Sequence, residues 1–274
     1  EILSINFFRK NMDLFYKYAL DLIDIGKSYV CDCDPEYISN LRYESKDCPC
    51  ASNPIEDNLS LWKEMESAEE GSYSLRLRGD MSSKNTVMRD PTMFRIVDHP
   101  HPIHGDKYRV WPVYDFACAI EDSVLGITHV LRSNEFALRI ELQNYIRNLL
   151  YLRNPLIIEY SRFSVKGAST SKRLIRPLID EKVVSGWDDP RLVTIRGLKR
   201  RGIIPEAIHM LAEEIGLSKS EPEIDWSLIE SLNRKIIDST SNRYYFVPEP
   251  KSLDVIDASY QTIQLNLHPD FDRG

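Results

Sequence analysis

The stretch YRVWPVYDFACAIEDSVLGITHVLR, residues 108–132, decides the fold class. Extended apolar segments alternate with helical patterns in it, and the alternation continues to residue 160. The pattern predicts, in order, a strand over 108–116 that reaches a turn or helix start, a helix over 117–124, a strand over 127–131, a helix over 134–151 and a strand over 156–160. Strands that alternate with helices are typical of parallel βαβ units. The sequence therefore predicts an α/β fold with a parallel sheet in this part of the chain.

Polar and charged side chains stand where the predicted parallel strands end. They are Tyr114 and Asp115, Arg132, and the pair Arg162 and Phe163. Ligands of open α/β sheets bind outside the carboxyl ends of the strands. We therefore expect the chemistry of the protein at this edge of the sheet.

The chain on either side of this stretch has different patterns. Before it, apolar stripes of helical spacing alternate with half-exposed strands of period two. The predicted elements there are helices over 12–25 and 55–70 and strands over 72–78 and 93–97. After it, the predicted elements are helices over 192–201, 205–216 and 226–237, followed by strand-like alternation over 241–274.

Length and composition exclude several classes of protein. The 274 residues predict two domains, at roughly 150 residues per domain. Hydrophobic residues at 42% and charged residues at 28% exclude a disordered or low-complexity chain. Mean hydropathy is -0.36, and no apolar run approaches the roughly 18 residues of a membrane span. The first ten residues have no basic region followed by an apolar run, so we expect neither a signal peptide nor a membrane partner.

The distribution of charge is more informative than the net charge of -7. That net charge, with a pI of about 5.5, argues at first against a nucleic-acid partner. Residues 1–70, however, hold 15 acidic against 7 basic residues, whereas residues 162–201 hold 11 basic against 4 acidic. A solvated helical face is the ordinary explanation of such a run. The loop GASTSKR over 167–173 also lies within it, and this favours a site for a polyanion.

Four of the five cysteines form two closely spaced C-x-C pairs. They are Cys31 with Cys33, and Cys48 with Cys50. Four thiolates joined by a short connection can bind Zn²⁺ tetrahedrally, although the commoner spacing is C-x2-C. Disulfides are disfavoured without a secretory signal, and four incidental thiols around a loop remain the alternative. Cys118 stands apart in an apolar stretch and is expected to be a small buried side chain.

The histidines of residues 99–104, HPHPIH, have the composition of a metal site. The prolines hold this segment extended, so its side chains cannot share a helical face. We therefore expect a structured loop.

Three groups of residues resemble glutamyl-tRNA synthetases of the archaeal and eukaryotic type, and they occur in the family's order. The first is MRDPTMFR over 88–95; the second is YDFA over 114–117, EDS over 121–123 and GITHVLR over 126–132; the third is EYSRF over 159–163, SKR over 171–173 and GWDDPR over 186–191. Together they extend over nearly the whole chain, and the combination is far more specific than any one motif.

The family is class I, in which a Rossmann fold activates glutamate with ATP and passes it to the 3′ end of tRNA. The resemblance implies four parts: an α+β acceptor-binding insertion over 1–107, the second half of the Rossmann-type parallel sheet over 108–165, a helical stem-contact region over 166–240, and the start of a β-barrel anticodon-binding domain over 241–274. The family's other signature, H-I-G-H, is absent. We expect the first Rossmann half before Glu1, and the residues printed here to be inactive alone.

The resemblance also implies roles in nucleotide chemistry. Ser171, Lys172 and Arg173 match the family's K-M-S-K-S loop. A mobile lysine ammonium on this loop stabilises the charge that builds on the triphosphate of ATP, bound with Mg²⁺, as the glutamate carboxylate attacks the α-phosphorus. Arg162, Phe163 and Glu135 match positions near the nucleotide.

Amino-acid choice is expected at Arg132, because glutamyl enzymes carry arginine there and glutaminyl relatives an uncharged residue. A guanidinium pairs with the side-chain carboxylate of glutamate, whereas bound glutamine leaves that charge unpaired. Tyr114 would donate its hydroxyl in the same pocket, and Asp115 would orient the substrate ammonium or a helix terminus. The alternatives are an ion pair of Arg132 with Glu135 and a core position for Tyr114.

The predicted function is therefore glutamate–tRNA ligase, with tRNA-Glu as substrate and tRNA-Gln as a second substrate left open. The alternatives are glutaminyl-tRNA synthetase and a non-catalytic tRNA-binding fragment. ATP with Mg²⁺, glutamate and tRNA are the expected partners, zinc the expected structural metal, and a cytoplasmic monomer the expected state.

Overall fold

The structure is a computed structural model that describes residues 11–272. The expectation that no signal peptide is present concerns residues 1–10, which lie outside the described residues. The chain forms two compact units that divide between Tyr160 and Ser161. The elements of the first unit are α1 Met12–Asp24, β1 Ser28–Cys31, α2 Pro35–Glu44, α3 Ile55–Glu64, β2 Ser74–Leu77, β3 Thr92–Ile96, β4 Val110–Pro112, α4 Tyr114–Val124, β5 His129–Ser133, α5 Ala137–Leu149 and β6 Leu156–Tyr160, with 3₁₀ turns at Pro49–Ser52, Thr86–Met88 and Asn134–Phe136. Those of the second are β7 Ser164–Val165, α6 Lys172–Asp180, α7 Ile195–Arg201, α8 Pro205–Ile215, β8 Glu223–Ile224 and α9 Trp226–Ile237.

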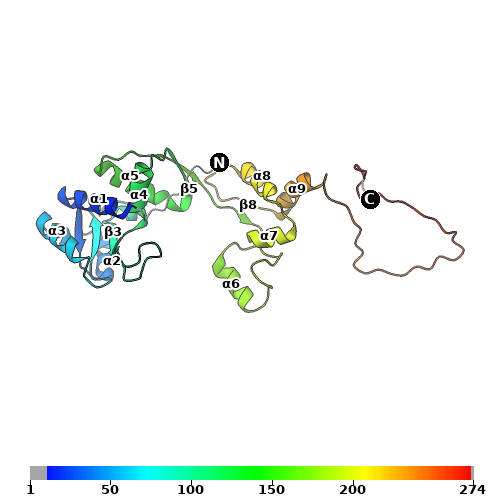
Figure 1. Cartoon of the computed structure of the whole chain (residues 1–274), viewed down its shortest axis with the longest axis horizontal. Coiled ribbons are helices and arrows are strands. Elements are labelled where there is room, and N and C mark those ends of the chain that lie inside the picture. The colour runs from blue at the N-terminus through cyan, green and yellow to red at the C-terminus, as the bar shows by residue number, and fades with distance from the viewer. Residues whose placement is uncertain (1–10, 273–274) are drawn as a thin grey trace. The chain divides into compact units, whose positions relative to one another are not determined.

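The first unit is built on an antiparallel sheet in the order β1-β2-β3-β4. The apolar stripe of α1 buries Phe15 and Leu22 completely against this sheet. Aromatic rings join the layers: Phe94 of β3 lies 4.9 Å from Phe116 of α4 and 5.1 Å from Trp62 of α3, measured between ring centroids. Figure 1 shows α4 and α5 side by side at one end of this unit and α2 and α3 at the other. One core therefore connects the sheet with the helices that carry the predicted site.

The parallel βαβ prediction is confirmed for β5 and β6, which pair in parallel with Arg132 opposite Glu159. It is wrong for the strand predicted at 108–116, because β4 pairs antiparallel with β3 and places Phe94 opposite Pro112. A local pattern predicts a strand but not its partner. The fold class is α/β, as predicted. Tyr114 and Asp115 lie in the first turn of α4 rather than at the end of a parallel strand.

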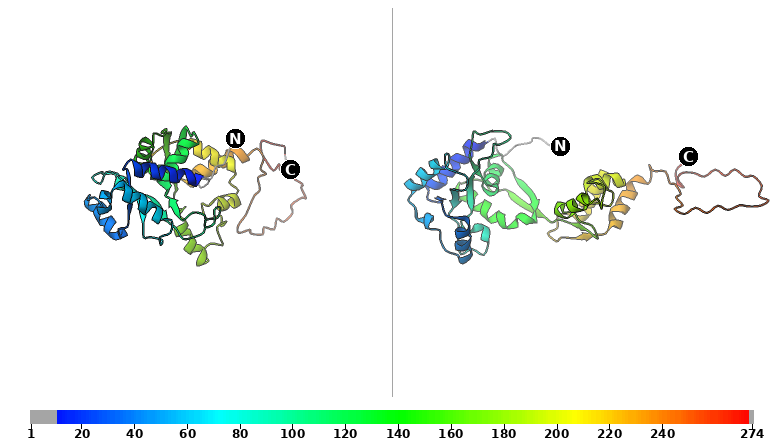
Figure 2. Two further views of the ribbon diagram at one scale, coloured as in Figure 1. Left: turned by 60° about the vertical axis from the view of Figure 1, so that its left-hand side comes forward. Right: turned by 90° about the horizontal axis from the view of Figure 1, so that it is seen from below.

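The second unit is a small helical body with its own core. α8 and α9 pack against each other around Leu211 and Leu232, and the short parallel pair β7–β8 adds Val165. Figure 2 shows these two helices, in yellow and orange, lying together. Gly202 ends α7 in the left-handed conformation, φ 90°, as the sequence predicts for a glycine stop.

Several predicted bounds differ from the observed ones. The helix predicted over 55–70 ends at Glu64, and the helix predicted from residue 192 begins at Ile195 with Thr194 as its N-cap. The Asp189 carboxylate accepts hydrogen bonds from the amides of Ser185 and Arg191 in the turn before this helix. α2 was not predicted, although Asp34 caps it and proline opens it.

No strand occurs within residues 241–272, where the sequence alternates like a strand. A strand forms only when a neighbour satisfies its backbone groups, and most side chains of this segment are exposed. The assignment of residues 241–274 to a barrel domain stays a prediction, as do the other three domain bounds. Within residues 11–272, no helix is both long enough and apolar enough to cross a membrane.

Candidate functional site

The centre of the candidate site is a buried hydrogen-bonded chain of three side chains from three elements. Nη2 of Arg132, on β5, donates to Oε1 of Gln143, on α5, at 2.9 Å. Nε2 of Gln143 donates to Oδ1 of Asp115, on α4, at 3.1 Å. Asp115 also forms an ion pair with Arg139. The exposed fractions are 7% for Arg132, 0% for Gln143 and 5% for Asp115, so the chain is shielded from water.

Arg132 retains unused hydrogen-bonding capacity. Its Nε and Nη1 atoms are buried and have no hydrogen-bond partner. A second buried arginine provides the comparison: Nε, Nη1 and Nη2 of Arg147 donate to Ala119, Asn144 and Asp122, respectively, at 3.0–3.1 Å. Buried donors without partners are costly in a protein interior. Nε of Arg42, Arg76 and Arg78 is also buried without a partner, but among the described arginines Arg132 has two such donors. We therefore expect Arg132 to receive an acceptor, and a carboxylate matches its charge and geometry.

Tyr114 lies beside this chain and is 47% exposed, so it is not a core residue. Its ring centroid is 5.3 Å from that of Phe136, and the Arg139 guanidinium lies 6.0 Å from it. Burial of the hydroxyl, followed by the proximity of Cys118, raises the pKa of Tyr114 to about 12, while Arg132 lowers it. At neutral pH the hydroxyl is therefore a hydrogen-bond donor.

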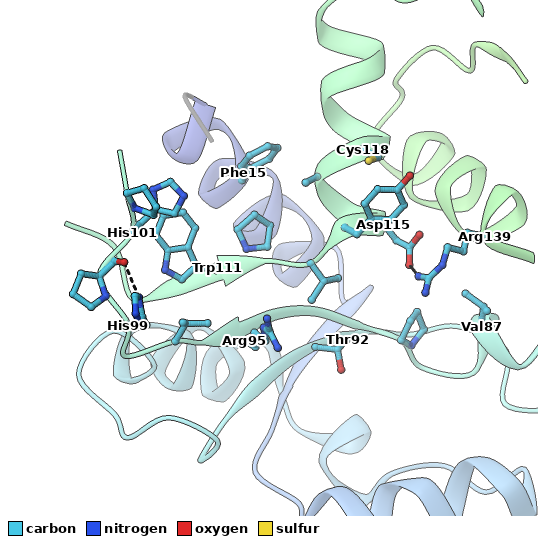
Figure 3. A pocket seen from close by; sticks show the side chains of 18 of the residues that line it. Phe15, Val87, Thr92, Arg95, His99, His101, Trp111, Asp115, Cys118 and Arg139 are labelled. Carbon is cyan, nitrogen blue, oxygen red and sulfur yellow. Dashed lines mark hydrogen bonds and ion pairs between the residues drawn. The ribbon is translucent and has the colours of Figure 1, made fainter. Parts of the chain in front are cut away.

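A pocket of about 810 Å³ runs along this part of the first unit. Figure 3 shows Asp115 and Arg139 facing each other at one end, with His101 and Trp111 toward the other. Tyr114 and Cys118 also line it. Burial raises the pKa of the Cys118 thiol to about 11, so this cysteine is a neutral, weakly reactive wall of the pocket.

The histidine-rich segment is a structured loop, as predicted, but residues 101–105 form a turn and are not extended. The backbone of His101 pairs with that of Gly105, and Nδ1 of His101 accepts hydrogen bonds from the amides of Ile103 and His104. The His101 ring stacks on Trp111 with a centroid distance of 4.7 Å. These contacts give the histidines a role in shaping the loop.

The residues matched to nucleotide chemistry fall in both units. Glu135 lies in the 3₁₀ turn after β5 in the first unit. In the second unit, Arg162 and Phe163 are exposed between Tyr160 and β7.

The predicted lysine loop takes a different form in the structure. Lys172 is the first residue of α6, Ser171 is its N-cap, and Arg173 follows in the first turn. All three side chains are exposed. The partial positive charge of a helix N-terminus adds to these cations, so the segment is suited to an anionic ligand.

The four cysteines of the two C-x-C pairs converge. Sγ atoms lie 3.7 Å apart for Cys31 and Cys48, 3.8 Å for Cys33 and Cys48, and 3.5 Å for Cys33 and Cys50. A tetrahedral zinc site with Zn–S bonds of about 2.3 Å has neighbouring sulfurs about 3.8 Å apart. All four ligand atoms lie within 4.8 Å of one another, and the residues are not disulfide-bonded. The donor set and its spacing fit a zinc ion.

Sequence reasoning missed Gln143 and Arg139. They lie four positions apart on α5, and both reach Asp115. Their spacing puts both residues on one face of the helix. Two polar residues on a face that packs against another helix could have indicated a shared polar partner there. Their partner on α4 was not accessible from the local pattern.

Comparisons with known proteins show the family of the chain. A family model described as the catalytic domain of class I tRNA synthetases (E and Q) matches residues 7–239. The glutamate–tRNA ligase of Korarchaeum cryptofilum is 43% identical over 266 residues, which are 96% of this chain and 47% of that protein. The one from Pyrococcus horikoshii is 44% identical over 262 residues, 94% of this chain and 46% of that protein. The chain thus spans about half the length of these relatives.

Among solved structures, a glutamate tRNA ligase from Elizabethkingia meningosepticum, in complex with its amino acid, resembles the chain with a TM-score of 0.57. The two are 17% identical, and the likeness covers 88% of this chain and 56% of that one. At this identity the likeness concerns the fold. It extends the α/β assignment over most of the chain.

Proposed function

The chain belongs to the catalytic-domain family of the class I tRNA synthetases for glutamate and glutamine, and we propose that it is part of a glutamate–tRNA ligase. In this reaction the α-carboxylate of glutamate attacks the α-phosphorus of ATP and pyrophosphate leaves. A hydroxyl at the 3′ end of tRNA then attacks the glutamyl carbonyl of the adenylate, and AMP leaves. The observation that carries the proposal is the buried Arg132 guanidinium with two unused donors. The similarity to archaeal glutamate–tRNA ligases supports it.

Arg132 selects glutamate by charge. The side-chain carboxylate of glutamate accepts hydrogen bonds from the free donors and neutralises the buried cation. Bound glutamine leaves the guanidinium uncompensated, at a cost of about 3–5 kcal/mol in a dry site. The Tyr114 hydroxyl donates a hydrogen bond to the same substrate. Asp115 accepts hydrogen bonds from Arg139 and Gln143, and it thereby fixes the position of Gln143 beside Arg132.

The residues proposed to bind the nucleotide are those that the family resemblance matches to the ATP site. Lys172, with Ser171 and Arg173, contributes cations at the start of α6, and these stabilise the charge that develops on the triphosphate. Arg162, Phe163 and Glu135 complete the ATP contacts. Mg²⁺ bound to the triphosphate supplies further charge neutralisation. No side chain need act as a general base, because the attacking carboxylate is already ionised.

Zinc is proposed as a structural metal at Cys31, Cys33, Cys48 and Cys50, because their sulfur spacing fits a tetrahedral site. These residues sit in a small core of their own with Tyr29 and Ile38. A bound ion would connect β1 to the turn that precedes α3. Its role is to hold this part of the first unit together rather than to react.

tRNA is the proposed macromolecular partner, and the basic segment 162–201 of the second unit its binding region. On α7 the exposed side chains of Arg196, Lys199, Arg200 and Arg201 form a cationic surface. Such a surface contacts phosphates without reading sequence. The division into acceptor-binding, Rossmann, stem-contact and anticodon-binding parts, and a monomeric cytoplasmic enzyme, belong to the same proposal.

ATP–pyrophosphate exchange with tRNA present tests the function, in the complete enzyme that contains this chain. Exchange that depends on glutamate, and not on glutamine, supports a glutamate–tRNA ligase. Preference for glutamine would establish the glutaminyl alternative. Absence of exchange with either amino acid, in a folded protein that still binds tRNA, would favour a non-catalytic tRNA-binding protein.

A further inference from the structure

Gln143 holds together two groups of opposite charge that do not touch each other. Its amide accepts a hydrogen bond from Arg132 and donates one to Asp115, at 2.9 and 3.1 Å. The side chain is 0% exposed, and it comes from the centre of α5. A single neutral amide therefore occupies the space in which a buried ion pair between Asp115 and Arg132 would otherwise form.

The carboxylates of this cluster are already matched with other arginines. Asp115 forms its ion pair with Arg139, and Asp122 forms one with Arg147 at 3.0 Å. Among residues 11–272, no carboxylate forms an ion pair with Arg132. Arg132 is thus a buried cation without a direct ion pair, although its charge acts on Asp122, the carboxylate that Arg147 already binds. Gln143 is the hydrogen-bond partner that Arg132 and Asp115 share.

We propose that Gln143 is a positioning residue for glutamate: its neutral amide separates the Asp115 carboxylate from Arg132 and reserves the positive charge of Arg132 for the side-chain carboxylate of the substrate. The inference rests on the proposed function and deepens it. The hydrogen bond to Nη2 also fixes the plane of the guanidinium, so that Nε and Nη1 are oriented before substrate binds.

The chemistry of the amide explains why glutamine suits this position. A glutamate would pair with Arg132 and neutralise it internally, and its second oxygen would oppose Asp115. An apolar side chain of the same length would leave Nη2 of Arg132 and Oδ1 of Asp115 without this partner. Only a neutral group with both an acceptor and a donor satisfies the two neighbours and leaves the net charge of Arg132 unchanged.

The test compares Gln143→Glu and Gln143→Met with wild type in the complete enzyme. ATP–pyrophosphate exchange with saturating tRNA gives KM for glutamate, KM for ATP and the relative kcat/KM for glutamine. We expect KM for glutamate to rise roughly tenfold to hundredfold in Gln143→Glu, because the new carboxylate competes with the substrate. The rise in Gln143→Met should be smaller, because the charge of Arg132 remains. KM for ATP should not change, and preference for glutamate over glutamine should fall in Gln143→Glu.

The outcomes separate positioning from a structural role. Equal effects of the two variants on KM for glutamate, or no change in Gln143→Glu, would overturn the inference, as would parallel losses in KM for ATP. If Gln143→Glu does not fold, as judged by thermal unfolding, Gln143→Met decides: an unchanged KM for glutamate overturns the inference, and a selective rise supports it. A wild-type enzyme that activates no glutamate would instead overturn the proposed function itself.

Discussion

The Sγ atoms of Cys31 and Cys48 lie 3.7 Å apart, although the two residues are separated by 17 positions in the chain. Thiols at this distance, without a disulfide, match neighbouring corners of a tetrahedral metal site. Burial is the main reason that the pKa of the Cys33 thiol rises to about 11. Bonds from four thiolates to Zn²⁺ would add to the small core that these residues form with Tyr29 and Ile38.

The first prediction concerns zinc content. Purified protein should contain about one zinc per chain, measured by metal analysis, and Cys48→Ser should lower that content well below one. Removal of the metal with a chelator should lower Tm by roughly 5–10 °C, because a structural zinc contributes several kcal/mol to folding. Cys118→Ala is the matched control, because Cys118 is buried in α4 outside the cluster, and its zinc content should equal that of wild type. Wild-type protein without zinc would contradict the assignment.

The second prediction concerns Arg132. Arg132→Leu should reduce kcat/KM for glutamate by at least about a hundredfold, because the charged hydrogen bonds to the substrate carboxylate are lost. Arg132→Lys keeps the charge but not the planar donor geometry, so it should retain part of the activity. Arg153→Leu is the control, since Arg153 is exposed and donates to the carbonyl of Ile127. Unchanged exchange kinetics in Arg132→Leu would remove this residue from the site.

Much of the site could be predicted because it depends on local signals. Arg132 ends an apolar run of strand length, and the two C-x-C pairs lie close in sequence, on either side of α2. The antiparallel partner of β4 could not be predicted, because the pairing of Phe94 with Pro112 is a contact between distant segments. The role of Gln143 could not be predicted for the same reason. Its hydrogen-bond partners Arg132 and Asp115 lie on other elements, and they meet Gln143 only where α5 packs against α4.

The third prediction concerns Lys172. Lys172→Ala should lower kcat for glutamate-dependent exchange by on the order of a hundredfold, with a small change in KM for glutamate, because the ammonium acts on charge that develops in the transition state. Arg176→Ala removes a cation from the same helix and serves as control. Arg176 is exposed, and its Nε lies 3.9 Å from Oδ2 of Asp180. Because an exposed ion pair of this kind contributes little, the loss of Arg176 should leave kcat near wild type. Equal losses in both variants would indicate a general effect of charge.

The fourth prediction concerns the pH dependence of stability at Asp189. Hydrogen bonds from the Arg191 side chain, and then from the amides of Ser185 and Arg191, lower the pKa of Asp189 below its usual 3.8. A carboxyl with a lowered folded pKa stabilises the fold above its unfolded pKa, and this stabilisation is lost as pH falls from about 4 toward the folded pKa. Asp189→Asn should therefore unfold at lower urea concentration than wild type at pH 7, and the difference should shrink below about pH 4. A difference that stays constant down to pH 2 would contradict the role of the charge.

The fifth prediction concerns Gly197 in α7. A Cβ at this position would lie 2.6 Å from the carbonyl oxygen of Leu192 and 2.7 Å from that of Asp189, both in the turn that precedes the helix. Alanine is the better helix former by about 1 kcal/mol, but backbone oxygens at these distances cannot move aside cheaply, so overpacking of about 1–3 kcal/mol should dominate. Gly197→Ala should therefore lower the free energy of unfolding, measured with urea. At Gly186, the nearest atom to a new Cβ is the side-chain oxygen of Asp188 at 3.2 Å, which can rotate away. Gly186→Ala should thus cost less, and the opposite order would show that the turn before α7 yields to the added methyl group.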